Sequence, residues 1–311
     1  MQIYFLDYDQ QPVLNPGCGV CKTVSSLTVT TISMGLLNRA IEHYKVYGFY
    51  NLLGAASTKL FNRDIITPVL FPVWYGTNTF LSPWFEYNGV TVNLEHEAIS
   101  TAVKREFMLG YETAELRLIE RNLKKSANVV ELGGGLGITS CFIDGNVDVE
   151  GKHFSVEANP ELKPVLEAHK ARNKATFEII QKAYSPTDGS VTFHLHDDVY
   201  SSGTQSRKSE YDDSVTVSTI DLRTICGEYS LDEFDLIADI EGEEHSLFSE
   251  ELDLIKRRCR LLIVELHDVE DATVADGRKQ LLENDFELID QTSNVFVFRN
   301  TLMNEKVSEV E

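Results

Sequence analysis

A glycine-rich loop follows a short apolar run at residues 129–140, which read VVELGGGLGITS. Glycines have no Cβ atom, so such a loop can turn tightly and let its backbone approach a bulky ligand. The spacing fails the dinucleotide fingerprint, which needs a glycine three positions after the second, and no lysine is present for a phosphate-binding P-loop. The acid before the glycines would repel a phosphate but attract a cation. The pattern Glu131-x-Gly133-x-Gly135-x-Gly137 therefore predicts a site for a cationic cofactor.

A second acid ends the next apolar run. Glu157 lies 26 positions after Glu131, where doubly wound folds place the acid that accepts hydrogen bonds from ribose hydroxyls. Asn159 is a suitable N-cap and Pro160 a suitable first helical residue, so we expect a helix to start there. These signals predict that Glu157 points into the crevice at the carboxyl edge of the sheet, although an ordinary surface position would also suit a glutamate.

Further acids and a histidine follow two later apolar runs: Asp239, Glu241 and Glu244 after the first, and Glu265 and His267 after the second. A hydroxyl group is a poor nucleophile while protonated, and a positioned base accelerates its reaction by roughly 10²–10⁴-fold. Crowded carboxylates can share a proton, which raises the pKa of one member toward the range of a base. They could equally hold a divalent ion such as Mg²⁺, or cap the following helix. The catalytic candidates are Asp239, Glu241, Glu244 and His267.

The second part of the chain alternates short apolar runs with amphipathic stretches. Runs at 127–132, 153–158, 177–185, 234–240 and 260–266 are typical of a mainly parallel, doubly wound α/β sheet. The runs 286–291 and 294–299 are separated by two residues, too few for a helical crossover, so they predict a hairpin with an antiparallel last strand. Two extra strands are expected at 190–196 and 215–222, joined by a polar surface loop that could alternatively be a lid. His194 and His196, two apart in the first extra strand, lack a third metal ligand.

The amino-terminal part has a different pattern. Leu37, Ala40, Ile41 and Tyr44 share one face at helical spacing, and residues 61–95 contain short β-rich runs broken by Pro, Gly and Asn. We therefore expect an α+β extension before the main domain. The predicted divisions are a cap, substrate-recognition or dimerisation region at 1–105, the α/β domain at 106–300 and an acidic tail at 301–311.

Composition limits the classes of partner. Asp and Glu outnumber Lys and Arg by 49 to 28, a formal net charge of −21, which argues against nucleic acid or an anionic membrane surface as the partner. The five cysteines do not form a disulfide framework, and the single CxxC at Cys18 and Cys21 offers too few ligands for a closed zinc site. No signal peptide or membrane span is evident. We expect a cytoplasmic protein that could form homo-oligomers, and a neutral or cationic substrate suits its charge better than an anionic one.

Several separated motifs together resemble the FkbM family of class I S-adenosylmethionine-dependent methyltransferases. These are Glu131-x-Gly133-x-Gly135-x-Gly137, Tyr111-Glu112 before it, Glu157-Ala158-Asn159-Pro160, the strand end Ala183-Tyr184, and Asp239-Ile240-Glu241-Gly242-Glu243-Glu244. The resemblance covers about two-thirds of the chain and implies a Rossmann-like seven-stranded sheet with an antiparallel last strand, S-adenosyl-L-methionine as cofactor, and O-methylation of a sugar or metabolite hydroxyl. It also implies a set of cofactor-binding residues: Glu112, Glu131, Gly133, Gly135, Gly137, Glu157, Ala158, Asn159, Ala183, Tyr184 and Asp239.

One position departs from the family pattern. Ile237 stands where the family commonly has a lysine, two residues before the aspartate of the fourth strand. Two alternatives to hydroxyl methylation therefore stay open at this stage. The chain could methylate a protein or an amine on the same fold, which would suit its acidic character, or it could be a non-catalytic cofactor-binding module.

Overall fold

A seven-stranded sheet forms the centre of the molecule. The computed structural model describes residues 71–72, 74–195 and 213–303. In the sheet the strand order is β11-β12-β10-β9-β3-β4-β5, and all strands except β12 run parallel. Their bounds are β3 Val129–Leu132, β4 His153–Val156, β5 Glu178–Ile180, β9 Phe234–Ala238, β10 Cys259–Glu265, β11 Phe286–Thr292 and β12 Val295–Asn300. This confirms the doubly wound sheet with a closing hairpin that the sequence predicts.

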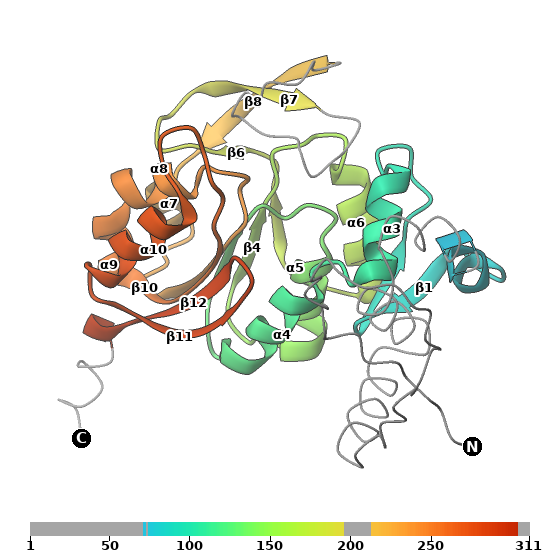
Figure 1. The fold of residues 1–311 in the computed structure, drawn as a ribbon, viewed down its shortest axis with the longest axis horizontal. Helices are drawn as coiled ribbons and strands as arrows, with labels where there is room; N and C mark the ends of the chain where they lie inside the picture. The colour runs from blue at the N-terminus through green and yellow to red at the C-terminus, as the bar shows by residue number, and fades with distance from the viewer. Residues whose placement is uncertain (1–70, 73, 196–212, 304–311) are drawn as a thin grey trace, which may run out of the picture.

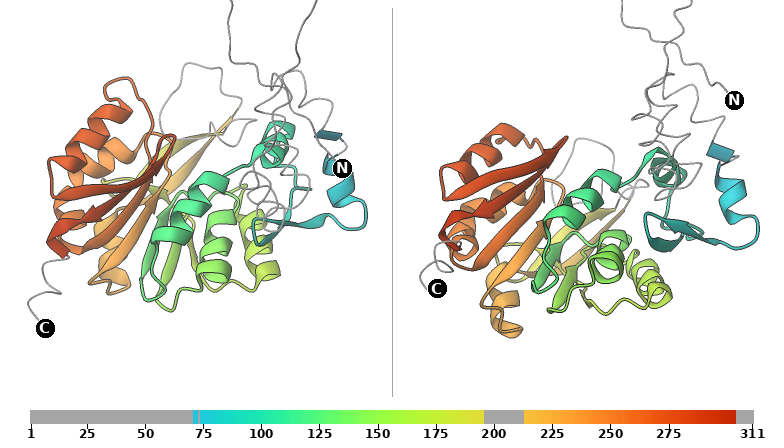
Figure 2. Two further views of the ribbon diagram at one scale, coloured as in Figure 1. Left: turned by 60° about the horizontal axis from the view of Figure 1, so that its bottom comes forward. Right: turned by 90° about the horizontal axis from the view of Figure 1, so that it is seen from below.

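Helices cover both faces of this sheet (Figures 1 and 2). The apolar core on one face includes side chains of α4 Thr113–Asn122, α5 Ile138–Phe142 and α6 Lys163–Asn173. The core on the other includes side chains of α7 Leu222–Glu228, α8 Glu244–Glu250, α9 Leu252–Arg258 and α10 Val274–Leu282. A five-residue π-helical turn, η1 Ile143–Val147, continues α5. β3, β4 and β9 are buried along their whole length, as expected for parallel strands covered on both faces, although β4 (HFSV) includes two polar residues.

A hairpin and a helix before the main domain pack against it. Strands β1 Trp84–Tyr87 and β2 Val90–Asn93 pair antiparallel, and helix α3 Thr101–Leu109 follows. The imidazole of His169 in α6 bridges the backbones of Asn93 and Leu136, at 2.9 Å from Asn93 N and 2.8 Å from Leu136 O. The hairpin therefore shares a core with the sheet, and the expected boundary between residues 105 and 106 falls inside α3.

The β1–β2 hairpin agrees with the few antiparallel strands expected within 61–95, but the described residues before it are not strands. Residues 71–72 and 74–79 are helical. Their aromatic side chains pack on one another, with Phe71 stacked on Tyr75 at 5.4 Å between ring centroids and Trp74 set edge-on to Phe85 at 5.7 Å. This aromatic packing overrides the weak local signal for strands. The helix expected at 37–44 and the tail at 304–311 lie outside the described residues.

A small second sheet lies at one end of the main sheet (Figure 1). Its order is β6-β8-β7, with bounds β6 Ala183–Tyr184, β7 Ser190–Leu195 and β8 Asp213–Ile220. The two extra strands are thus confirmed, and they pair antiparallel with each other. The polar connection at 196–212 and the side chains of His194 and His196 lie outside the described part of the chain.

None of the described helices has both the length and the apolar character needed to cross a membrane. The described cysteines Cys141, Cys226 and Cys259 are buried free thiols.

Candidate active site

The glycine loop after β3 needs its glycines for steric reasons. Gly133, Gly135 and Gly137 all have positive φ angles, of 95°, 50° and 75°. A Cβ atom on Gly133 would lie 1.8 Å from the backbone oxygen of Asp239, and one on Gly137 would lie 3.1 Å from Leu166 Cγ. The loop is therefore a tight turn pressed against the end of β9 and against α6, as its spacing predicts.

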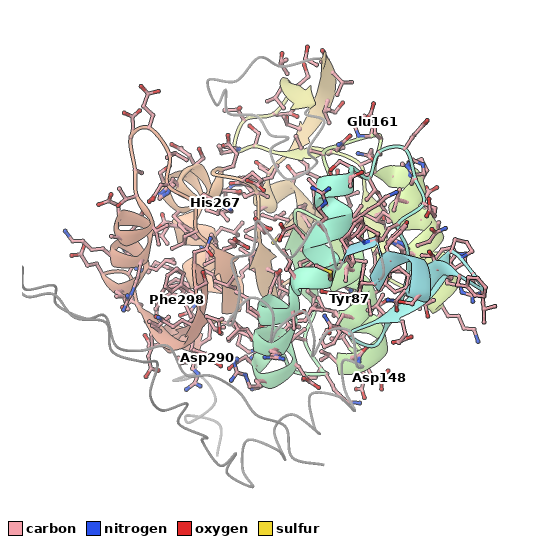
Figure 3. The ribbon with its side chains drawn as sticks, turned by 45° about the vertical axis from the view of Figure 1, so that its right-hand side comes forward. Tyr87, Asp148, Glu161, His267, Asp290 and Phe298 are labelled. Carbon is pink, nitrogen blue, oxygen red and sulfur yellow. The ribbon has the colours of Figure 1, made fainter. Side chains whose placement is uncertain are left out.

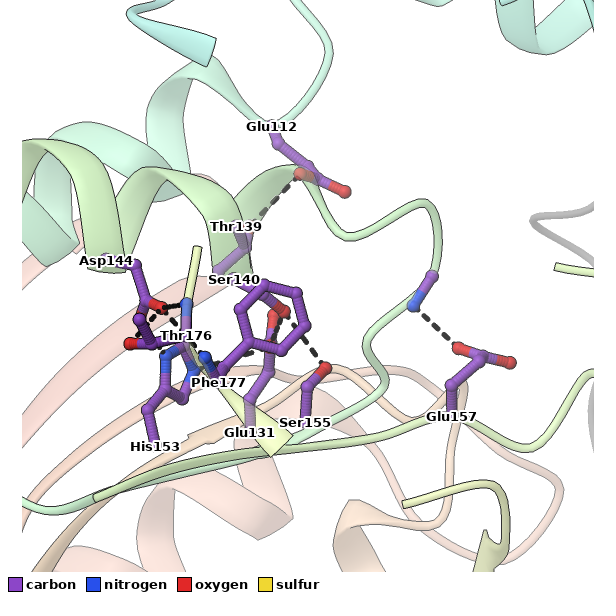
Figure 4. Close-up of polar contacts among 11 residues, drawn as sticks. Glu112, Glu131, Thr139, Ser140, Asp144, His153, Ser155, Glu157, Thr176 and Phe177 are labelled. Carbon is purple, nitrogen blue, oxygen red and sulfur yellow. Dashed lines mark hydrogen bonds and ion pairs between the residues drawn. The ribbon is translucent and has the colours of Figure 1, made fainter. Parts of the chain in front are cut away.

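Glu157 at the end of β4 is held against this loop (Figure 4). Its carboxylate accepts hydrogen bonds from Gly135 N at 2.6 Å and from Asn159 N at 2.5 Å, and the residue is buried. Burial raises the pKa of Glu157 to about 7, although these hydrogen bonds act in the opposite direction. The acid thus lies beside the loop, at the carboxyl edge of the sheet, where the sequence predicts it.

The predicted helix start beside Glu157 is wrong by three residues. Helix α6 begins at Lys163, with Pro164 in its first turn. Asn159 is buried and its side chain accepts from Glu161 N at 2.9 Å, so it stabilises a turn before the helix instead of capping the helix itself.

Glu131 does not face the open side of the loop. Its buried carboxylate accepts a hydrogen bond from Ser140 Oγ and lies 3.7 Å from Nε2 of His153, whose Nδ1 is 2.6 Å from Asp144 Oδ1. Burial disfavours an imidazolium at His153, but the two carboxylates outweigh it and raise the pKa of His153. Figure 4 shows these side chains gathered beneath α5, away from Glu112 and Glu157. In place of the expected contact with the cofactor, Glu131 ties α5 to the sheet.

The strand end Ala183-Tyr184 is also mostly structural. The buried Tyr184 hydroxyl donates to Glu251 Oε2 at 3.0 Å, and the same carboxylate accepts from the first backbone N–H groups of α7, Leu222 and Arg223, at 2.9 Å each. Ala183 is buried against Val217, with Ala158 packed beside it and partly exposed. Of the three expected contact residues here, only Ala158 presents part of its surface to solvent.

An acidic cavity of about 650 Å³ lies next to the glycine loop. It is bounded by the α3–α4 connection, by the ends of β9 and β10, and by the β11–β12 turn. Among the described residues that line it there are six carboxylates and neither lysine nor arginine: Glu106, Glu112, Glu115, Asp239, Glu241 and Glu265, with His267 as the one basic side chain. The carboxyl ends of the neighbouring strands β9 and β10 thus bring together residues that are far apart in sequence.

His267 is surrounded by carboxylates. Its Nδ1 lies 3.3 Å from Glu244 Oε1, and its Nε2 lies 3.9, 3.8 and 3.9 Å from oxygens of Asp239, Glu241 and Glu265. Burial disfavours the imidazolium, but the hydrogen bond to Glu244 and the surrounding negative charges raise the pKa of His267 to about 9. His267 is therefore a cation at neutral pH. Figure 3 shows its place, across from α3.

Glu244 holds His267 in place through its contact with Nδ1. Its fully buried carboxylate accepts from Ile240 N at 2.8 Å and Gly242 N at 3.0 Å, at the start of α8. Glu244 does not line the cavity. The sequence grouped it with the catalytic candidates, and the structure instead makes it the support of His267 and of the turn at Gly242.

Asp239 lines the cavity, and one of its carboxylate oxygens has no hydrogen-bond partner among the described residues. Its Oδ1 is buried and accepts no hydrogen bond from a described residue. Burial, together with the charges of Glu265 and Glu241, raises the pKa of Asp239 well above its usual range, while His267 lowers it. The backbone of Asp239 also touches Gly133. Asp239 thus joins the glycine loop to the acidic cavity.

Two of the acids in the cavity have strained backbones. Glu112 and Glu241 have φ angles of 50° and 54°, a left-handed conformation that costs of order 1 kcal/mol or more in a residue other than glycine. Glu112 Oε2 accepts from Thr139 Oγ1 at 3.0 Å, and burial raises the pKa of Glu112 to about 7. Such strain persists where the surrounding structure imposes it. The β1–β2 hairpin fixes the backbone just before Glu112, because Tyr87 Oη (Figure 3) donates a hydrogen bond to Tyr111 O at 2.8 Å.

Mg²⁺ does not fit the cluster well. Asp239, Glu244 and His267 offer three ligand atoms within 4.8 Å of one another. Mg²⁺ prefers an octahedron of oxygen ligands, whereas one of these three ligand atoms is an imidazole nitrogen. The imidazolium already supplies a positive charge among these carboxylates, so we derive no step through a metal.

Sequence reasoning missed Glu115 and Glu106. Glu115 lies in the segment TAELRLIERN, next to Leu116 and on the buried side of α4 with Leu118 and Ile119. An acid within the apolar face of a predicted amphipathic helix is the signal that could have identified it.

Comparison with known proteins places this geometry in a family. A family model described as "Methyltransferase FkbM domain" matches residues 133–294, from the glycine loop to the β11–β12 turn. No curated protein matches the chain.

Solved structures with a similar arrangement include an rRNA methylase from Streptococcus thermophilus, with 12% identity, a TM-score of 0.39, and 60% of this chain and 93% of that chain covered. A precorrin-6y C5,15-methyltransferase from Geobacter metallireducens shares 12% identity at a TM-score of 0.36, with 60% and 86% covered. Fibrillarin from Aeropyrum pernix, solved with bound S-adenosyl-L-methionine, shares 12% identity at 0.35, with 59% and 73% covered.

The strand order with its antiparallel last strand, the glycine loop and the acid beside it agree with the family match, which spans more than half of the 311 residues. On this evidence the chain belongs to the FkbM family of S-adenosylmethionine-dependent methyltransferases.

Proposed function

We propose that the chain transfers the methyl group of S-adenosyl-L-methionine to a hydroxyl oxygen of a carbohydrate or small metabolite bound in the acidic cavity. The adenosine part would lie over the glycine loop, with the ribose hydroxyls donating to Glu157, and the methionine end would extend toward Glu112. One observation carries the proposal. Gly133 and Asp239 are in such close contact that the loop and the cavity meet at one point, where methyl donor and acceptor could be brought in line.

Asp239 is the proposed base. The oxygen of the acceptor forms a bond to the methyl carbon, the carbon–sulfur bond breaks with its electrons returning to sulfur, and the hydroxyl proton passes to Asp239. The buried Oδ1 atom, which has no hydrogen-bond partner among the described residues, supports this role. The His267 imidazolium at 3.9 Å favours the ionised aspartate that must accept the proton. No lysine is needed in this scheme, which suits Ile237.

Alignment supplies the larger share of the expected acceleration. Methyl transfer is an in-line displacement, and well-oriented reactions can gain on the order of 7–11 kcal/mol from positioning. A base should add roughly 10²–10⁴-fold.

The test is turnover by the isosteric variant Asp239→Asn, measured as release of S-adenosylhomocysteine over a panel of hydroxyl acceptors. The expected fall in kcat is about 10²–10⁴-fold with cofactor affinity retained. A variant that keeps wild-type kcat would remove Asp239 as the base. A native chain that binds the cofactor but turns over no acceptor would favour a non-catalytic module.

A further inference from the structure

Glu115 is the one buried glutamate of the described structure whose carboxylate has no partner. Five glutamates are buried: Glu115, Glu131, Glu157, Glu244 and Glu251. The other four accept hydrogen bonds from serine or from backbone N–H groups. Glu115 is 7% exposed, lines the acidic cavity, and forms no hydrogen bond or ion pair with another described residue. The Glu115 oxygens are not among the fully buried atoms, so they face the cavity. A carboxylate held among other carboxylates without a cation beside it is costly, so its retention calls for an explanation.

The surroundings of Glu115 increase this cost. Burial raises the pKa of Glu115 well above its usual range, and the negative charges of Glu112, Asp239 and Glu265 raise it further. The amide donor of this region is already used, because Asn294 Nδ2 donates to Glu265 Oε1 at 2.8 Å. The cation His267 is surrounded by the other carboxylates. No described residue of the cavity wall is therefore placed to neutralise Glu115.

A ligand can supply the missing cation. The cofactor carries an ammonium group of its own, and the proposed function places the methionine end of the cofactor near Glu112, which also lines the cavity. Glu115 lies three residues further along the chain, in α4, and this ammonium leaves it without a cation. A second positive charge must come from the acceptor.

We propose that the acceptor is an amino alcohol or amino sugar, whose protonated amine binds the Glu115 carboxylate in the acidic cavity while a neighbouring hydroxyl is methylated. The inference rests on the proposed function and narrows its substrate class. An ammonium nitrogen has no lone pair, so it serves as an anchor and is unchanged by the reaction. The hydroxyl oxygen gains the methyl group and its proton passes to Asp239.

The test compares acceptors that differ only in the amine. The full-length chain, saturated with S-adenosylhomocysteine, is titrated calorimetrically with D-glucosamine against D-glucose, D-galactosamine against D-galactose, and ethanolamine against ethylene glycol. At least one amino compound should bind ten times more tightly than its neutral partner. The isosteric variant Glu115→Gln should abolish that difference, and Glu120→Gln, an exposed glutamate on the same helix, should preserve it.

Several outcomes of these titrations would contradict the proposed role of Glu115. Equal binding of the two members of every pair, no binding of any amino compound, or an unchanged preference in Glu115→Gln would overturn the proposal. So would a methylated nitrogen in the product. Loss of cofactor binding in Glu115→Gln, measured by titration with S-adenosyl-L-methionine, would assign Glu115 to the cofactor instead. Failure of the proposed function is distinguished by the wild-type chain, which would then either not bind the cofactor or bind it and methylate no hydroxyl acceptor.

Discussion

Two buried glutamates, Glu131 in β3 and Glu115 in α4, have opposite surroundings. Glu131 lies in a network with Ser140, His153 and Asp144, whereas Glu115 faces a cavity with no partner. A charge with hydrogen bonds and an opposite charge beside it contributes to folding, and a charge without them opposes folding. The comparison indicates that Glu131 serves the structure and that Glu115 is retained for a ligand. Four predictions test this difference.

Weakening the charge network around His153 should have the largest effect on stability. Glu131→Gln removes one of the two carboxylates beside His153 and leaves its buried imidazolium with Asp144 alone. We expect the free energy of unfolding to fall by about 3 kcal/mol, as when one partner of a buried ion pair is removed. Chemical denaturation measures this. A change below about 0.5 kcal/mol would show that the network contributes little.

The charge on His267 should make stability depend on pH. Its pKa is raised from 6.5 to about 9, so its contribution is fully present below pH 6.5 and is lost as the pH rises through 9. Deprotonation of His267 leaves the negative charges of the surrounding carboxylates without a positive charge beside them. We expect a loss of about 2 kcal/mol of unfolding free energy across this window, taking roughly 1.4 kcal/mol for each unit of pKa shift as an upper bound.

The variant His267→Gln isolates this contribution. The raised pKa values of Glu112 and Glu157, about 7 each, also remove stability as pH rises, but from 4.5 through 7. Denaturation of both proteins between pH 6.5 and 9.5 should therefore show a smaller loss in the variant. Parallel curves would contradict a protonated His267.

The glycine loop should tolerate a methyl group less well than a helix does. Gly137 has a φ of 75° and its Cβ would press on Leu166, so Gly137→Ala should cost about 1–2 kcal/mol. Gly227 is an exposed helical position in α7 with open space around it, and Gly227→Ala should raise stability by up to about 1 kcal/mol. Thermal unfolding should show a lower melting temperature for Gly137→Ala and a higher one for Gly227→Ala. Equal shifts in melting temperature would indicate that position 137 does not require glycine.

The smallest expected effect is that of the unsatisfied acid. Glu115→Gln keeps the shape of the side chain and removes the buried charge, so stability should be unchanged or rise by up to about 1 kcal/mol. The same Glu→Gln change would thus give opposite results at positions 131 and 115. A fall of more than about 1 kcal/mol at position 115 would mean that its carboxylate has a structural partner.

The sequence predicts the framework well because hydrophobic periodicity and loop length determine it. The strands from Val129 to Asn300 and the closing hairpin are recovered from apolar runs and from a two-residue connection. The position of Glu157 also follows, since a strand end before a turn must lie at the carboxyl edge.

Side-chain direction is harder to predict than position. Glu131 and Glu157 both come from strand ends, but only the structure shows that Glu131 turns beneath α5 and Glu157 toward the loop (Figure 4). Tyr184 and Glu244 were expected in the site for their place in motifs, and their hydrogen bonds give them supporting roles. Glu115 was missed because its chemistry depends on the absence of a partner, which no local pattern shows.

The proposed roles of the glycine loop and of the acidic cavity both depend on binding of the cofactor. Isothermal titration of S-adenosyl-L-methionine into the wild-type chain and into Glu157→Ala tests it directly, with Glu120→Gln as the control. We predict saturable binding to the wild-type chain and to the control, and affinity at least ten times weaker in Glu157→Ala, or about 1.4 kcal/mol. No heat of binding with the wild-type chain, or equal affinity in all three proteins, would contradict the account.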